Sequence, residues 1–424
     1  FLFNTYKATM LSADLREKMQ NAESEVHKVF KPRLVNVREV NPYIKKDGTL
    51  SKRGLTDEEY DKVLTEIVLR EPEQDENGEW VTSKPEPFMR KKLQDFNLGS
   101  RKQIGEYLQD FGWKPQDFTP TGQPIVDERR LSKITNIPEV KLIADYLLLQ
   151  KRIALIDSWI AAVEDDDRIH GFVICTGAIT GRMSARSPNT QQIPSVKSLY
   201  GKECRSCWIV PEGYKLVGVD ASGLELRMLA HYMKDEEFTN EIINGDIHSR
   251  NQQTAGLKSR DQSKTFIYAL LYGAGNKKIG QVVGGNAKDG ARLKERFFAN
   301  NPAFRRLRER VSKASTKGYL KGLDGRKIYI RHPHASLNSL LQGAGAVVMK
   351  KALMLLNDKA TKEKLDFKFV ANVHDEWQVE VVEKDVENFG SLAVQAIKDA
   401  GEYFNMECPL DAKYKAGDNW SETH

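Results

Sequence analysis

Two apolar segments that lie far apart in the sequence each end in an aspartate, and this feature constrains the fold most. In YKLVGVDASGLELRMLAHYM, residues 214–233, an apolar run ends at Asp220 and is followed by a short turn and a helical pattern. In FKFVANVHDEWQVEVV, residues 367–382, two alternating apolar runs flank a turn around Asp375. We therefore predict one strand before Asp220 and two strands joined by a tight turn at Asp375.

These two aspartates would repel each other if their strands placed them side by side, unless cations lay between them. Two Mg²⁺ ions about 4 Å apart meet that need and also promote in-line phosphoryl displacement. The predicted turn carries His374 and Glu376 as well as Asp375. The alternative is that Asp220 and Asp375 are ordinary strand-end aspartates, which is the commoner role for either residue alone.

The segment RDQSKTFIYALLYG, residues 260–273, predicts a helix with one unusual face. Four residues spaced by four share this face, two cations followed by two rings: Arg260, Lys264, Tyr268 and Tyr272. The other side is apolar, and Gly273 is a typical helix end. Cations grip a triphosphate and rings stack on a base and sugar, so the face suits a nucleoside triphosphate.

Length and composition limit the remaining possibilities. A chain of 424 residues is too long for one hydrophobic core, so we expect several subdomains. The excess of 65 basic over 59 acidic residues, a net charge of +6, permits a polyanionic partner. No apolar run reaches about 18 residues, which argues against a membrane span.

The cysteines and the first residues indicate the compartment and the extent of the chain. Four cysteines form no disulfide framework, which favours a reducing, cytoplasmic location. Cys204 and Cys207 form a single C-x-x-C pair, which we interpret as free thiols and not as a zinc site. The start has neither a signal-peptide pattern nor an initiator Met, so we expect a fragment of a longer chain.

Residues 31–95 have an unequal distribution of charge and are interpreted as an insertion. Residues 31–53 carry seven basic and two acidic side chains, whereas residues 57–79 carry ten acidic and two basic ones. Thr56 with Glu59 forms a capping box, which predicts the start of a helix in the acidic part. A solvated surface loop is the alternative interpretation.

A second predicted helix start follows this insertion. The sequence Gly-Ser-Arg-Lys before a helical pattern directs free backbone N–H groups and the cations Arg101 and Lys102 to one place. Such a helix end suits a phosphate group.

Together these segments resemble the family A DNA polymerases. VDASGLELR resembles their first carboxylate motif, RDQSKTFIYALLYG their nucleotide-binding fingers helix, and VHDE their second carboxylate motif. TGRMSARSPNTQQIP, GDIH, GLDGRK and LNSLLQGAGA agree as well, in the same order. The resemblance spans the chain, is weakest across residues 31–95, and is strongest to replicative enzymes of T-odd short-tailed phages.

The resemblance implies an α+β fold with right-hand polymerase architecture: a thumb, a palm built on an antiparallel sheet, and helical fingers. The expected domains are a thumb at 1–135 with its insertion at about 31–95, palm at 136–232, fingers at 233–335 and palm again at 336–424. The implied partners are primer-template DNA and dNTPs, and an insertion at this place in the phage enzymes docks a processivity factor. A phage-encoded enzyme would act in the host cytoplasm.

The resemblance also implies roles for single residues. Asp220 and Asp375 would hold two Mg²⁺ ions, or Mn²⁺ in their place, together with the backbone carbonyl of Ala221. Lys264 would grip the triphosphate and protonate the leaving pyrophosphate. Five further side chains would bind the incoming nucleotide: Arg260, His248, Tyr268, Tyr272 and Glu225. Four would lie by the primer end and the minor groove: Arg182, Asn338, Gln342 and His374.

Two alternative functions remain open at this point. A single-subunit RNA polymerase shares the palm arrangement, but Glu225, implied to exclude a 2′-hydroxyl, and Tyr268 argue against it. A catalytically silent DNA-binding module is the other alternative, and the presence of Asp220, Lys264 and Asp375 together argues against it. We see no second cluster of metal-binding acids before Arg182, so a proofreading exonuclease would require an upstream segment.

Overall fold

The computed structural model describes residues 1–70, 73–74, 80–81 and 84–423. The chain forms two compact units, the large unit (Phe1–Ala13 with Ala154–His424) and the small unit (Asp14–Ile153). Both contain helices and strands, which agrees with the predicted α+β class.

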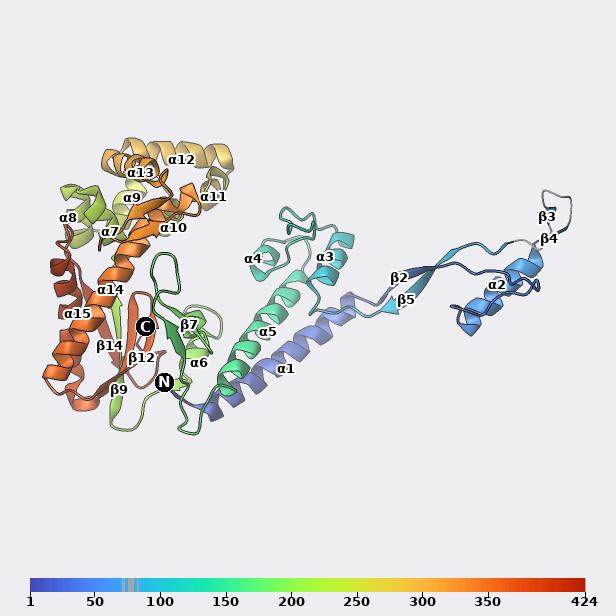
Figure 1. The fold of residues 1–424 in the computed structure, drawn as a ribbon, viewed down its shortest axis with the longest axis horizontal. Helices are drawn as coiled ribbons and strands as arrows, with labels where there is room; N and C mark the ends of the chain where they lie inside the picture. Colours follow the sequence, from blue (N-terminus) through green and yellow to red (C-terminus); the bar gives the residue numbers. More distant parts are fainter. Residues whose placement is uncertain (71–72, 75–79, 82–83, 424) are drawn as a thin grey trace. The chain divides into compact units, whose positions relative to one another are not determined.

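A four-stranded antiparallel sheet forms the centre of the large unit. Its strands, in spatial order, are β12 (Phe367–Val373), β13 (Glu376–Val382), β9 (Tyr214–Ala221) and β14 (Ala412–Gly417). The strand predicted before Asp220 and the two predicted around Asp375 are confirmed. The long helices α14 (Ser336–Lys362) and α15 (Val386–Tyr403) pack against each other beside this sheet (Figure 1).

Strand β13 is buried on both faces, which differ in character. Trp377, Val379 and Val381 point into the apolar core that the sheet shares with its helices. The alternate residues are polar and equally buried: Glu376, Gln378 and Glu380. Since buried polar groups need partners, this second face must be closed by hydrogen bonds.

Polar partners from the loop before β6 (Phe172–Ile174) and from the C-terminal segment close that second face. Arg168 forms a bidentate ion pair with Glu380, at 2.9 and 3.0 Å. The hydroxyl of Thr423 donates to Gln378 at 2.7 Å. The indole N–H of Trp420 donates to the buried carboxylate of Glu376 at 3.0 Å. These bonds tie β13 to the C-terminal segment and to the loop before β6.

The remaining elements of the large unit are short helices and strand pairs. Its helices are α6 (Gly201–Arg205), α7 (Leu224–Met233), α8 (Glu236–Asn244), α9 (Ile247–Ala255), α10 (Arg260–Leu271), α11 (Asn276–Val282), α12 (Ala287–Ala299) and α13 (Pro302–Ser315). Its strand pairs are β1 (Leu2–Phe3) with β8 (Trp208–Ile209), β6 with β7 (Ser184–Arg186), and β10 (Tyr319–Lys321) with β11 (Lys327–Tyr329). Three 3-10 turns complete it: Thr190–Gln192, Pro333–Ala335 and Glu383–Asp385.

Among the described residues, one helix has the length and composition to cross a membrane, Pro333–Lys362, with a mean hydropathy of 1.3. Within it, 61% of the most apolar window is buried inside the protein. This helix is therefore a core helix of the large unit. Cys204 and Cys207 are buried and form no disulfide, and burial raises the pKa of Cys207 to about 11.

The small unit is a helical core with a long extension. Its elements are parts of α1 (Thr5–Val29) and α5 (Val140–Ile160), with α2 (Asp57–Leu69), α3 (Arg101–Asp110), α4 (Glu128–Leu131), β2 (Arg33–Val40), β3 (Glu73–Gln74), β4 (Trp80–Val81) and β5 (Phe88–Gln94). Stacked and tilted rings of Phe30, Phe96 and Tyr107 join its helices.

The predicted insertion is built on the pair β2 and β5, which places its two ends together. Arg33 lies opposite Gln94 in this pair. The predicted capping box of Thr56 and Glu59 is present at the start of α2. Glu59 also pairs with Arg90 of β5, so the acidic helix is held by the insertion's own cations. Part of the acidic segment lies outside the described residues.

The ion pair under the sheet yields a stability prediction. Arg168→Met should lower the free energy of unfolding by about 3–5 kcal/mol, because it leaves the Glu380 carboxylate buried and unpaired. Arg168→Met with Glu380→Met should recover most of that loss, since no charge then remains buried. Urea unfolding followed by tryptophan fluorescence measures both, and equal losses in the two variants would contradict the argument.

Candidate active site

The two aspartates lie at the same end of adjacent strands. Strand β9 pairs with β13 so that Asp220 stands opposite Glu376, the residue after Asp375. The backbone N–H of Ala221 donates to the carbonyl of Asp375 at 3.0 Å. Asp220 is exposed and Asp375 is half-buried, so a cation can reach the edge that they form.

The expectation that the turn carries Glu376 is wrong. Glu376 is the first residue of β13 and is 5% exposed. Its carboxylate accepts from Trp420 at 3.0 Å and from Gln378 at 2.6 Å on the polar face of the strand. Asp375 remains in the turn before the strand, whereas these two hydrogen bonds hold the Glu376 carboxylate in the buried polar face.

The predicted cationic and aromatic face is present on α10. Ser259 caps the helix by accepting from the backbone N–H of Gln262. The apolar side of α10 is buried: Phe266, Ile267, Leu270 and Leu271. Arg260 and Lys264 are exposed on the other side, and the rings of Tyr268 and Tyr272 follow with 6.3 Å between their centroids.

Tyr268 connects this helix to the carboxylates. Burial raises the pKa of its phenol, and the charges of three carboxylates raise it further: Glu225, Asp375 and Asp220. The phenol is therefore protonated at neutral pH and lies within electrostatic reach of both aspartates. His248 of α9 is a neighbour of this ring, with 6.3 Å between the ring centroids. Burial and the charge of Arg260 lower the pKa of His248, so its imidazole is neutral at pH 7.

Asp246, which sequence reasoning did not single out, organises the cationic end of the site. Its carboxylate receives Nε of Arg260 at 2.7 Å and Nη2 at 3.2 Å. It also caps α9, accepting from the backbone of His248 at 3.1 Å and the hydroxyl of Ser249 at 2.7 Å. The hydrogen bonds from Arg260 and Ser249 hold the pKa of Asp246 well below its usual range. The signal was in the sequence, because GDIH is a typical capping pattern.

Glu225, in the first turn of α7, is fixed by two neighbours. The hydroxyl of Tyr272 donates to its carboxylate oxygens, at 3.2 and 3.0 Å. Nη2 of Arg182 lies 3.3 Å from it, and both side chains of this ion pair are mostly buried. Burial and then Glu225 raise the pKa of Tyr272.

Apart from Arg182, the residues predicted to contact DNA lie on α14, in the turn between β12 and β13, and at the start of α3. Asn338 and Gln342 lie one helical turn apart on the half-buried surface of α14. His374 occupies the turn between β12 and β13 with a φ of 62°, and desolvation followed by the Arg182 charge lowers its pKa. Arg101 and Lys102 are exposed at the start of α3, in the small unit.

The oxygen atoms at the strand ends suit a hard divalent cation. Asp220 and Asp375 provide carboxylates, and the Ala221 carbonyl is the third candidate ligand. No group of three or more His, Cys, Asp or Glu forms a metal cluster within the described residues. Mg²⁺ keeps several waters and is held in many enzymes by one or two carboxylates plus substrate phosphates, so the residues present fit such an ion.

The whole chain has the fold of a right-hand polymerase module. It matches the POL domain of Pol1 from M. smegmatis, solved in complex with DNA primer-template and dNTP, with a TM-score of 0.79 and 20% identity. The match covers 100% of this chain and 68% of that one.

Sequence comparison identifies the family. The model of DNA polymerase family A matches residues 73–422, and the chain belongs to that family. It is 40% identical over 397 residues to the DNA-directed DNA polymerase of Enterobacteria phage T3 and 39% identical over 401 residues to that of Escherichia phage T7. Each match covers 84% of this chain and 56% of the relative, so the chain spans about half the length of these relatives.

Substitution can separate the two roles of Asp246, which caps α9 and pairs with Arg260. Asp246→Ala should speed hydrogen exchange in the first turn of α9 by about 5–30-fold, because the helix loses its cap. Asp246→Asn keeps a capping oxygen and should change this exchange much less, although it also removes the charge that holds Arg260. Hydrogen exchange read by mass spectrometry tests this, and equal acceleration in both variants would show that the cap is not responsible.

Proposed function

We propose that this chain is a template-directed DNA polymerase that adds deoxynucleotides to a primer 3′ end and releases pyrophosphate. The observation that carries the proposal is the pairing of β9 with β13, which brings Asp220 and Asp375 together within electrostatic reach of Tyr268. The phage relatives are DNA-directed DNA polymerases, and the similar POL domain binds primer-template and dNTP, which supports this reaction.

Asp220, Asp375 and the Ala221 carbonyl would hold two divalent cations, Mg²⁺ or Mn²⁺. When bound, such cations activate the attacking oxygen and stabilise charge on the transferring phosphoryl group. The Glu376 carboxylate is buried and accepts from Trp420 and Gln378, which leaves the two aspartates as the carboxylates proposed to hold the cations.

The cationic end of α10 would bind the triphosphate. Arg260 presents a guanidinium that Asp246 holds in one orientation, and Lys264 lies one turn further along the same face. Lys264 would donate a proton to the leaving pyrophosphate. His248, neutral and aligned by the capped start of α9, would donate a hydrogen bond to a phosphate oxygen.

The remaining site residues would select the sugar and hold the DNA. Glu225, fixed by Arg182 and Tyr272, would fill the space of a 2′-hydroxyl, which favours deoxynucleotides over the ribonucleotides of an RNA polymerase. Tyr268 would lie beside the sugar, and Tyr272 near the templating base. Two groups of side chains would contact DNA: Arg182, Asn338, Gln342 and His374 at the minor groove, and Arg101 and Lys102 at the backbone. The minor groove presents acceptors common to all base pairs, so such contacts verify geometry without reading sequence.

We retain the assignment of thumb to 1–135, palm to 136–232 and 336–424, and fingers to 233–335. The insertion at 31–95 is the proposed place for a processivity partner. Its basic stretch and its acidic helix α2 give two surfaces of opposite charge. The proposed location is the host cytoplasm.

The chemistry is tested by removing the metal ligands. Asp220→Asn or Asp375→Asn should lower primer extension with Mg²⁺ by roughly 10³-fold or more, because each loses a carboxylate that neutralises the cations. Duplex DNA binding should stay near the parent value, since it depends mainly on phosphate contacts. Asp358→Asn makes the same chemical change at an exposed position on α14, away from the two aspartates, and is the matched control.

Three results of this assay would change the proposal. Near-parental extension by either metal-ligand variant would remove the catalytic assignment. A parent chain that binds primer-template but never extends it would be a silent DNA-binding module. Preference for ribonucleotides over deoxynucleotides in the parent would indicate an RNA polymerase.

The insertion can be excised cleanly because its ends are paired. Replacing residues 35–92 by Asn-Gly joins β2 to β5 in a tight hairpin and keeps the ion pair of Arg33 with Glu106. We expect single-nucleotide addition to persist. The DNA products made in one binding event should become shorter. The slope of binding affinity against salt concentration should become less steep by about 0.9 for each phosphate that is no longer neutralised. Lys45→Ser with Lys46→Ser is the control that removes charge alone. Parental product length and salt slope in the excised variant would show that the insertion is a passive loop.

A further inference from the structure

One face of the β10–β11 hairpin is exposed and contains none of the residues proposed to act in catalysis. In this antiparallel pair Tyr319 lies opposite Tyr329 and Lys321 lies opposite Lys327. Alternation along the strands places these four side chains on one face. The leucine and isoleucine between them are buried on the other face, against the rest of the large unit. We call the exposed side, with Lys317 at its edge, the hairpin face.

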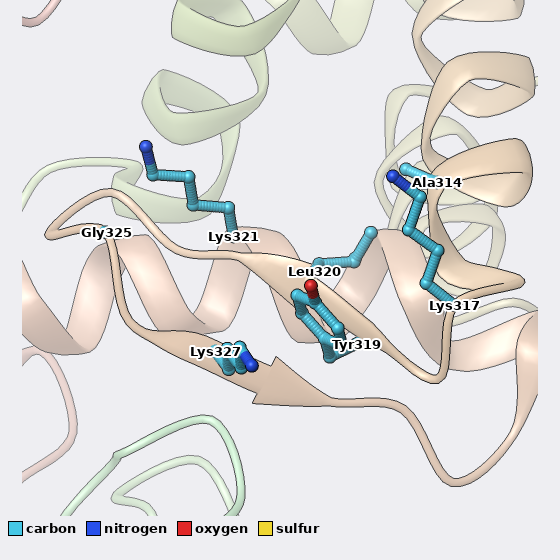
Figure 2. Close-up of a pocket in the computed structure, with 7 residues that line it drawn as sticks. All are labelled: Ala314, Lys317, Tyr319, Leu320, Lys321, Gly325 and Lys327. Carbon is cyan, nitrogen blue, oxygen red and sulfur yellow. The ribbon is translucent and has the colours of Figure 1, made fainter.

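The positive charge of the hairpin face works against the stability of the hairpin. Like charges directly opposite each other destabilise an antiparallel pair, and Lys321 and Lys327 occupy such positions. Lys317 adds a third cation beside a hollow of about 370 Å³, and none of the residues that line this hollow is acidic (Figure 2). The carboxylate of the hairpin turn, Asp324, lies 3.5 Å from Arg326 instead.

Two aromatic rings accompany these cations. The ring centroids of Tyr319 and Tyr329 are 6.5 Å apart, and Tyr329 is 65% exposed. Nζ of Lys327 lies 4.7 Å from the centroid of the Tyr319 ring. Figure 2 shows the Tyr319 ring between the side chains of Lys317 and Lys327. Packing of the core therefore does not account for the rings, which present a stacking surface flanked by charge.

The hairpin contacts two residues that neighbour the candidate active site in the sequence. Nη2 of Arg326 donates to the backbone carbonyl of Thr180 at 3.1 Å, two residues before Arg182. Ile328 packs against α14 at Gly343, where an added Cβ would lie 2.6 Å from its Cδ1. These contacts hold the hairpin beside the segments that carry Arg182 and Gln342.

We propose that the hairpin face binds single-stranded DNA, namely the unpaired template ahead of the site. The inference rests on the proposed polymerase function, because the template overhang is the unpaired part of a primer-template. Cations that follow a phosphate backbone beside rings that stack on bases are the usual means of binding single strands without sequence preference. A duplex hides its base faces from such rings, and an acidic polypeptide would need the cations but not the exposed tyrosine pair.

The experiment compares binding of a primer-template with a single-stranded overhang and of the same duplex without it, by fluorescence anisotropy. Lys321→Ser with Lys327→Ser should abolish the extra affinity that the overhang gives and lower its salt slope by about 1.4, leaving the blunt duplex unaffected. Lys362→Ser with Lys384→Ser removes the same charge from exposed sites elsewhere and should behave like the parent.

A ring substitution provides the independent test. Tyr329→Leu should weaken binding of the overhang by about 5–100-fold, whereas Tyr329→Phe keeps the ring and should retain parental binding. An unchanged overhang effect in the lysine pair variant would overturn the proposal. So would tighter binding of a polyglutamate peptide than of single-stranded DNA to the parent.

These are binding measurements and need no catalysis, so the two proposals can fail separately. A parent that never extends primers but loses the overhang effect on substitution refutes the polymerase function and retains a single-strand site. A parent that extends primers while all hairpin variants bind the overhang equally retains the polymerase function and refutes this site.

Discussion

The antiparallel pairing of β9 with β13 is the interaction on which the site depends. It brings two segments from distant parts of the chain to one sheet edge, with Asp220 opposite Glu376 and the N–H of Ala221 bonded to the carbonyl of Asp375. A slip of one residue would turn every side chain of one strand to the opposite face. The position of Asp220 relative to Asp375 therefore depends on this register.

Both faces of β13 enforce that register. Trp377 and Val379 fit the apolar core on one face, while Glu380 requires Arg168 on the other. In a shifted register the polar side chains would enter the core and the tryptophan would replace a hydrogen-bonded group, and each such exchange costs free energy. The buried polar network thus helps to fix the positions of Asp220 and Asp375, although it lies away from them on β13.

Local pattern was enough to predict much of this arrangement. Hydrophobic periodicity and capping residues depend only on neighbouring residues in the sequence. They were enough to predict the strands around Asp220 and Asp375, the capping box at Thr56 and the four-residue spacing on α10. The pairs Asp246 with Arg260 and Glu225 with Tyr272 were not predicted as contacts, because each joins separate helices whose packing decides the distance. Glu376 was predicted in the turn but begins β13, because a shift of one residue in the strand boundary decides between turn and strand.

Most charged side chains of the site are paired with a side chain of opposite charge or with a hydrogen-bond donor. These pairs affect how a nucleotide could bind. Asp246 engages Arg260 through Nε and Nη2, two of the three guanidinium nitrogens, so a phosphate can bind the remaining edge without displacing the carboxylate. Glu225 receives both Arg182 and the Tyr272 hydroxyl, which holds the carboxylate in place while it is mostly buried. Lys264 stands exposed between these two pairs on α10. The geometry therefore fixes the groups proposed to orient the nucleotide and leaves the lysine proposed as proton donor the freedom to follow the leaving group.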